Sequence, residues 1–131
     1  MPAAPPASTS ASPPAAVTGT RELWSHEFLD ALALEQCRET ARRIQAEPAL
    51  IEVARANIRR WLANTGYDSG EIRSLKEWEA FLTPEKLPLL LRVMIDPGEE
   101  ATRMRQSSPF AGILSREERE RITDRMIAAW S

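Results

Sequence analysis

From residue 25 onward, apolar side chains recur at the spacing of an α-helix. The first stripe has steps of four, four, four and three and comprises Leu29, Ala33, Cys37, Ala41 and Ile44. Such spacing places these side chains on one face of a helix. Ser25 has the chemistry of an N-cap, and Pro48 disfavours helical geometry at the residue before it. The pattern therefore predicts a helix that begins after Ser25 and ends near Ala46.

A second helix follows almost at once. Pro48 suits a first helical turn, because its nitrogen carries no hydrogen to donate. The apolar face of this helix comprises Leu50, Ala54, Ile58, Trp61 and Leu62. Asn64 and Gly66 then stop the helix, and residues 66–70 have the composition of a loop. Because the connection is short, we expect the two helices to form an αα-hairpin.

Two shorter helices are expected next. Ser74 and Glu77 have the spacing of a capping box, which predicts a helix from this point to about Leu82. Pro88 is tolerated only in a first turn, so the following helix should begin near Lys86. Its broad apolar face comprises Leu87, Leu90, Leu91 and Met94.

The C-terminal part of the chain repeats these signals. Residues 96–99 have the composition of a helix start, and this helix should reach about Gln106. Ser115 and Glu118 form a second capping box before the last helix, whose apolar residues are Ile122, Met126 and Trp130. No segment alternates with the period of a strand. The sequence therefore predicts an all-α fold, a compact bundle of five or six short helices.

The start of the chain has a different composition. Residues 1–20 are mostly Ala, Pro, Ser and Thr, and no charged side chain occurs among them. Such a segment has little apolar surface to offset the entropy of ordering. It also lacks the basic region and the Leu-rich region of a signal peptide. We therefore expect a disordered tail over residues 1–20 and a single helical domain over residues 21–131.

Composition and charge narrow the class of protein. Cys37 is the only cysteine, which excludes an internal disulfide and a Cys-rich zinc site. The most apolar window, Leu87–Ile95, is too short to span a membrane and contains Arg92. We expect a reducing, cytoplasmic location. A net charge of −2 gives no general attraction to nucleic acid or to an anionic membrane.

Few residues are suited to catalysis. His26 has no cysteine or second histidine beside it, so a solvated histidine is favoured over a metal ligand. Cys37 lies on the apolar stripe, where a buried inert thiol is favoured over a nucleophile. Ser107 and Ser108 lack both the motif and the base of a serine nucleophile. We therefore predict no catalytic residue, no cofactor and no metal, and an enzyme ranks third among the function classes.

Two arginine clusters make a nucleic-acid-binding regulator the alternative function. They comprise Arg38, Arg42 and Arg43 in the first helix and Arg55, Arg59 and Arg60 in the second. Carboxylates at Glu35, Glu39 and Glu52 are within helical reach of them. Trp61 lies on the apolar face, and not among the arginines as a base-stacking platform would require. A solvent-exposed face with internal ion pairs is therefore favoured.

Residues 103–114 are the least helix-like stretch of the second half. Pro109 and Gly112 favour a turn, whereas Phe110 is too apolar for a solvated linker. The stretch is either a packing clasp or a presented contact loop. We favour burial of the Phe110 ring, and the polar side chains that we expect at the surface are Arg103, Arg105 and Gln106.

A protein partner is the leading expectation for this stretch. Trp130 joins the predicted contacts because a tryptophan near a chain terminus can serve as an anchor for a partner. The predicted partner-binding residues are Arg103, Arg105, Gln106, Ser108, Phe110 and Trp130. We therefore expect a non-enzymatic, helical protein-binding module.

Two stretches carry a resemblance to a group of small bacterial helical proteins. They are Glu47-Pro-Ala-Leu-Ile-Glu-Val-Ala-Arg55, followed by Trp61, and Arg105-Gln-Ser-Ser-Pro-Phe-Ala-Gly-Ile-Leu114. In this group a tryptophan-bearing helix, as at Trp78, lies between the two stretches. Such proteins resemble the antitoxin-like partners encoded beside toxin genes. The resemblance covers about residues 25–125 and implies that the chain neutralises a toxin.

Overall fold

The computed structural model describes residues 25–64 and 69–130, and within these ranges the chain is all-α, as the sequence predicts. The α-helices there are α1 (His26–Ala46), α2 (Ile51–Leu62), α3 (Ser69–Phe81), α4 (Leu87–Ile95), α5 (Glu99–Arg105) and α6 (Arg116–Trp130). Two short 3-10 helices, η3 (Pro48–Leu50) and η4 (Pro84–Lys86), precede α2 and α4. The predicted tail over residues 1–20 lies outside the described residues.

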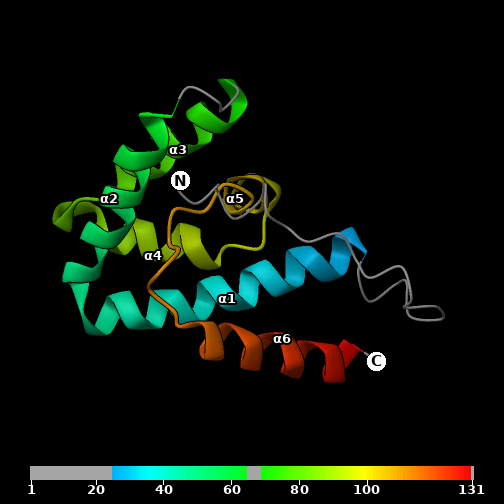
Figure 1. Ribbon diagram of the computed structural model, residues 1–131. Helices are drawn as coiled ribbons and strands as arrows, with labels where there is room; N and C mark the ends of the chain where they lie inside the picture. The colour runs from blue at the N-terminus through cyan, green and yellow to red at the C-terminus, as the bar shows by residue number, and fades with distance from the viewer. Residues whose placement is uncertain (1–24, 65–68, 131) are drawn as a thin grey trace.

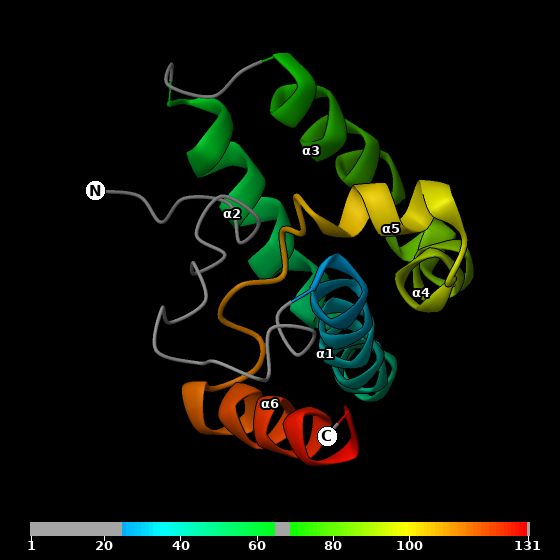
Figure 2. The same ribbon diagram turned by 90° about the vertical axis from the view of Figure 1, so that its right-hand side faces the viewer.

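The other helices are arranged around α1, the longest of them. In Figure 1, α6 lies beside α1 and runs in the opposite direction, while α2 and α3 extend away from the end of α1. Figure 2 shows α1 end-on, between α6 on one side and α4 with α5 on the other. The segment after α5 passes beside α2 before it enters α6. Helix α1 is therefore the element that connects α6 to the core.

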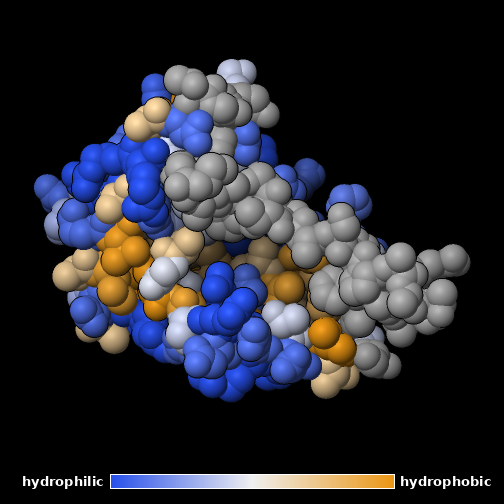
Figure 3. Space-filling view, in the orientation of Figure 1, coloured by the Kyte–Doolittle hydropathy of each residue, from blue (hydrophilic) through white to orange (hydrophobic). Residues whose placement is uncertain are grey.

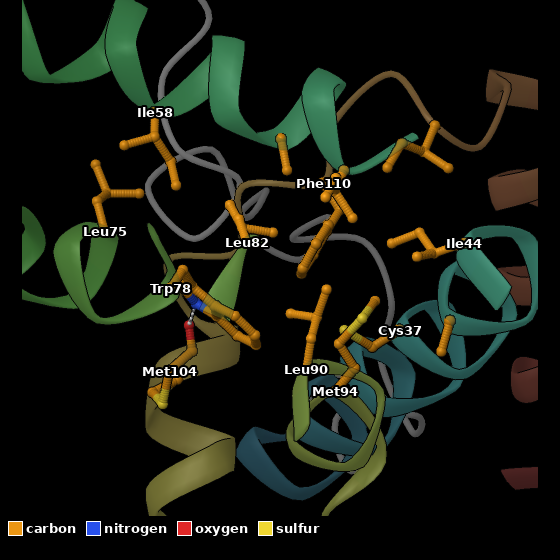
Figure 4. Packing of buried hydrophobic residues seen from close by; sticks show 14 of the residues in the cluster. Cys37, Ile44, Ile58, Leu75, Trp78, Leu82, Leu90, Met94, Met104 and Phe110 are labelled. Atoms are coloured by element: carbon orange, nitrogen blue, oxygen red, sulfur yellow. Dashed lines mark hydrogen bonds between the residues drawn. The ribbon is translucent and has the colours of Figure 1, made fainter. Parts of the chain in front are cut away.

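The core lies where α1 to α5 meet, and Figure 4 shows many of its side chains. Trp61 from α2 and Trp78 from α3 are fully buried, as expected for core anchors. Other side chains with no exposed surface include Ile44, Ile58, Leu75, Leu82, Leu90 and Met94. Burial of large apolar side chains is the main favourable term in folding a domain of this size.

Two predicted N-caps are confirmed. The Ser25 hydroxyl accepts a hydrogen bond from the backbone N–H of Phe28 at 3.2 Å. At the start of α6, the Ser115 hydroxyl accepts from the Glu118 N–H at 3.1 Å, and the Glu118 carboxylate accepts from the Ser115 N–H at 2.8 Å. This reciprocal pair satisfies two backbone donors that the helix itself leaves free.

The predicted start of the third helix is wrong. Helix α3 begins at Ser69, so Ser74 lies inside the helix and is buried. The Ser74 hydroxyl accepts a hydrogen bond from Arg103 of α5 at 3.1 Å. Capping-box spacing was misleading here because a serine that bonds another helix has the same local sequence as a cap. Residues 69 and 70, which were predicted to belong to the loop, are therefore part of α3. Residues 65–68 lie outside the described part of the chain.

Candidate functional site

The turn at residues 107–114 is fastened to the core through an aromatic contact. The Phe110 side chain is 6 % exposed, and its ring meets the Trp78 ring in a T-shaped contact with centroids 5.2 Å apart. The Trp78 indole N–H donates to the Met104 carbonyl at 2.7 Å, which links α3 to α5 (Figure 4). The expected burial of Phe110 is therefore confirmed, and its ring fixes the path of the turn.

Helix α2 also holds the 107–114 turn in place, through side-chain hydrogen bonds. The Asn57 side-chain amide donates to the carbonyls of Pro109 and Ala111, both at 2.8 Å. Its carbonyl oxygen accepts from the Arg60 guanidinium at 2.5 Å. Asn57 is 4 % exposed, and hydrogen bonds of this kind satisfy backbone groups that a turn would otherwise bury unpaired. Asn57 therefore holds the backbone on both sides of Phe110.

Gly112 has the backbone geometry that this turn needs. Its φ is +95°, in the region that side chains with a Cβ rarely adopt. The chain turns there and continues through Ile113 and Leu114, both buried, to the Ser115 cap. The predicted role of Gly112 in the turn is confirmed.

A hollow of about 600 Å³ lies between α1, the 107–114 turn and the first half of α6. Helix α1 lines it with His26, Leu29, Asp30, Leu32, Ala33, Gln36, Cys37 and Thr40. The remaining walls comprise Arg105, Gln106, Ser108, Phe110, Ala111, Gly112, Leu114, Arg119 and Thr123. Cavities of about 300–1,000 Å³ are the usual size of ligand sites. The turn and α6 thus build a pocket that neither element forms alone.

Part of the predicted apolar stripe of α1 lines this hollow. Leu29 and Ala33 are only partly buried, whereas Ala41 and Ile44, farther along the same stripe, are buried in the core. The stripe is therefore longer than the core that it packs against. Its N-terminal half presents apolar surface to the hollow.

Arg105 has an unexpected position. It is 5 % exposed, so the expectation that its side chain lies at the surface is wrong. Its guanidinium donates to the Met94 carbonyl at 3.2 Å and to the Val93 carbonyl at 3.4 Å, at the C-terminal end of α4, and to the Thr102 hydroxyl at 3.2 Å. Burial lowers the pKa of this guanidinium below its ordinary value. Arg105 therefore caps α4 and borders the hollow from inside.

Arg103 faces a different part of the molecule. It bonds Glu77 at 3.1 Å and Glu100 at 2.7 Å, and it also donates to the Ser74 hydroxyl. These carboxylates, Glu100 first, raise the pKa of Arg103. Arg103 joins α5 to α3 and does not line the hollow.

The other predicted contacts fall into two places. Gln106 is exposed, Ser108 is partly buried, and both line the hollow with Phe110 and Arg105. Trp130 is 42 % exposed at the end of α6, where its ring makes a T-shaped contact with Phe28 at 5.4 Å. The structure thus brings four of the six predicted residues together and leaves Arg103 and Trp130 apart from them.

Cys37 and His26 also border the hollow. Burial raises the pKa of the Cys37 thiol from 9.0 to about 12, so the thiol stays protonated at neutral pH and is a poor nucleophile. The His26 side chain is exposed at the start of α1. Among the described residues, no three His, Cys, Asp or Glu side chains are placed to share a metal ion.

The arginine faces of α1 and α2 are bonded within the chain. Ion pairs join Arg38 to Glu35 at 2.5 Å and Arg42 to Glu39 at 2.7 Å. Arg55 pairs with Glu52 and also donates to the Leu82 carbonyl at 2.8 Å, beyond the end of α3. The expected ion pairs within a helix are therefore confirmed for Arg38, Arg42 and Arg55, whereas Arg43 pairs with Glu118 of α6 and Arg60 bonds Asn57.

Comparison with known protein families, with curated proteins and with solved structures finds no significant match to this chain. Within the described ranges, no helix combines the length and the apolar character needed to cross a membrane.

Two residues of the site were missed or misplaced by the sequence analysis, although a signal for each was present. Asn57 is a polar residue at a core position of α2, between Ala54 and Trp61 on the buried face. Met104 and Arg105 follow Ala101 by three and four residues, the steps that place side chains on one face of α5. A polar side chain on a buried stripe indicates an internal hydrogen-bond partner.

Proposed function

We propose that this chain is a non-enzymatic binding module, which docks a segment of a partner protein in the hollow between α1, the 107–114 turn and α6. The observation that carries this proposal is the partly buried half of the α1 stripe. Leu29 and Ala33 line the hollow and are only partly buried, whereas Ala41 and Ile44 farther along the same stripe are buried in the core. Contiguous apolar surface of this kind is typical of an interaction site.

The walls of the hollow support a specific contact. Phe110 and Leu114 are buried behind it, while Gln106 and Ser108 add polar groups at its edge. Figure 3 shows that hydrophilic side chains cover the first turns of α6, the helix that contributes Arg119 and Thr123 to the hollow. An apolar centre with a polar rim is the usual arrangement of a protein-binding surface.

The sequence resemblance adds a specific form to this proposal. Residues 47–55 become η3 and the start of α2, and residues 105–114 become the end of α5 and the turn. Asn57, which follows the first segment by two residues in α2, bonds the second segment through the Pro109 and Ala111 carbonyls. On this basis the partner is a bacterial toxin, which the chain neutralises in the cytoplasm.

Nucleic-acid binding through the arginine faces has weaker support. Arg38, Arg42 and Arg55 each bond a carboxylate of their own helix, so binding phosphate would require breaking these pairs. Protein docking needs no such rearrangement on the apolar wall of the hollow.

The test is coexpression with the product of the neighbouring gene. We expect a complex that copurifies with the unmodified chain. Ala33→Trp fills the hollow from α1 and should weaken the complex at least tenfold. Ala80→Trp places the same side chain on an exposed position of α3 and is the matched control. Circular dichroism should show that both variants are folded.

Two results would contradict the proposal. One is a complex that Ala33→Trp and Ala80→Trp affect equally, because the partner then binds outside the hollow. The other is a folded chain that forms no complex with the neighbouring product and instead binds duplex DNA at nanomolar concentration, which would favour the nucleic-acid alternative.

A further inference from the structure

The Arg105 guanidinium carries a buried charge and has no carboxylate of the described residues in ion-pair contact, although Asp96 and Asp30 act on it from a greater distance. Its hydrogen-bond acceptors are the carbonyls of Val93 and Met94 and the Thr102 hydroxyl, all uncharged groups. No carboxylate of the described residues forms an ion pair with it. A buried charge is costly unless an opposite charge or a full set of hydrogen bonds compensates it.

One edge of this guanidinium has unused donors. Arg105 Nη1 donates to the two α4 carbonyls and Nη2 donates to Thr102, while the buried Nε has no partner in the described part of the chain. A guanidinium has five N–H groups, two on each terminal nitrogen and one on Nε. The Nε–H and one of the two Nη2 N–H groups lie on the same edge. This edge matches the two oxygens of a carboxylate.

The hollow beside Arg105 has the composition to hold an apolar group that carries one negative charge. Its α1 wall includes Leu29, Leu32 and Ala33. Arg105 and Arg119 line it as cations and Asp30 as an anion. These charged side chains therefore give the hollow a net charge of +1. A single carboxylate would neutralise this excess.

We propose that the partner inserts an Asp or Glu side chain flanked by apolar residues, and that Arg105 binds its carboxylate in the hollow. This inference rests on the proposed function, since it names the chemistry of the segment that docks there. The Arg105 Nε has no exposed surface, so binding of the carboxylate requires a covering side chain to move. Gln106 follows Arg105 directly, lines the same hollow and is exposed.

The proposed carboxylate site at Arg105 can be tested without the partner. Isothermal titration calorimetry on the full chain would compare decanoate with decanol, which have the same chain length but differ in the carboxylate. We expect decanoate to bind at least tenfold more tightly than decanol. Ala33→Trp should abolish this binding, whereas Ala80→Trp should leave it unchanged.

Arg105 itself requires a conservative variant, because its removal also uncaps α4. Arg105→Lys keeps the positive charge but loses the two-donor edge, and decanoate affinity should fall about tenfold while the fold persists. Arg105→Met should abolish the preference for the acid over the alcohol, provided that circular dichroism shows a folded chain.

Each outcome separates this inference from the proposed function. Equal binding of decanoate and decanol, or no binding of either, would refute the carboxylate site at Arg105. This holds even if the neighbouring gene product still docks in the hollow. Decanoate binding that neither Ala33→Trp nor Arg105→Lys affects would also overturn it. If the partner complex forms as expected, decanoate should compete with it. Arg105-dependent decanoate binding without any protein complex would instead identify a free organic acid as the ligand and refute partner docking.

Discussion

Phe110 and Trp78 meet in a T-shaped contact, with ring planes at 82° and centroids 5.2 Å apart. This contact joins the 107–114 turn to α3, which is distant in sequence. Aromatic pairs in this geometry add stability beyond the area that they bury. The turn is thus both a structural clasp and a wall of the hollow, so the two interpretations drawn from the sequence are compatible.

Truncating this contact should be costly. Phe110→Ala removes a buried ring and leaves a cavity, so we expect the free energy of unfolding to fall by about 3–5 kcal/mol. Urea denaturation followed by circular dichroism would measure this loss. Leu89→Ala is the control, because Leu89 is 46 % exposed and its truncation should cost less than about 1 kcal/mol. Similar losses for the two variants would show that Phe110 is not a clasp.

Asn57 should contribute through hydrogen bonds and not through volume. Asn57→Ala leaves the Pro109 and Ala111 carbonyls without their side-chain donor, so the free energy of unfolding should fall by about 1–3 kcal/mol. Hydrogen exchange in the turn should become faster in this variant. Arg60→Ala removes only the donor to the Asn57 oxygen and should cost less. A larger loss of unfolding free energy for Arg60→Ala than for Asn57→Ala would show that Arg60, and not Asn57, holds the turn.

The Cys37 thiol should make stability sensitive to alkaline pH. Its pKa is about 12 in the folded chain against 9.0 as the ordinary value, so above pH 9 the unfolded chain releases a proton that the folded chain keeps. Stability from this group is complete below pH 9 and falls as the pH rises toward 12. Denaturation midpoints between pH 7 and 10.5 would show the decline. Cys37→Ala should lack this component, and an unchanged pH profile in that variant would contradict the assignment.

Binding to nucleic acid should be weak. Fluorescence anisotropy with a duplex DNA at physiological salt should give a dissociation constant in the micromolar range or above, without sequence preference, since the net charge is −2 and the arginine faces are paired. Arg59→Glu alters an exposed arginine of α2 and should change little. Nanomolar binding with a steep salt dependence, lost in Arg59→Glu, would refute this expectation.

The N-terminal segment should contribute little to stability. Deleting residues 2–17 removes no large apolar side chain except Val17, so the thermal midpoint should stay within about 4 °C, which corresponds to about 1 kcal/mol for a domain of this size. Thermal unfolding of the full and shortened chains would measure the difference. A larger drop would show that this segment packs against the helices.

Local signals predicted much of the fold. Ser25 and Ser115 were identified as caps because an N-cap acts on residues two or three positions away. Pro88 lies in the first turn of α4, as predicted, whereas Pro48 lies in the 3-10 helix η3 just before α2. These effects are local, and a single sequence is enough to recognise them.

The site was harder to predict because it depends on contacts between distant residues. Ser74 bonds Arg103, Asn57 bonds the turn, and Arg105 bonds the end of α4. Each polar side chain has a partner on another element, and spacing along one helix carries no information about that partner. Phe110 was recognised because an apolar residue between Pro109 and Gly112 is unusual in a solvated turn.

The attachment of α6 has a consequence for access to the hollow. Helix α6 packs mainly on α1, with Phe28 against Trp130 at one end and an ion pair between Arg43 and Glu118 at the other. Among the described residues of α6, Ile122 alone is buried. A helix with so little buried surface has a low free energy of local unfolding. We therefore expect α6 to open locally more readily than the other helices, which would widen the hollow that it borders.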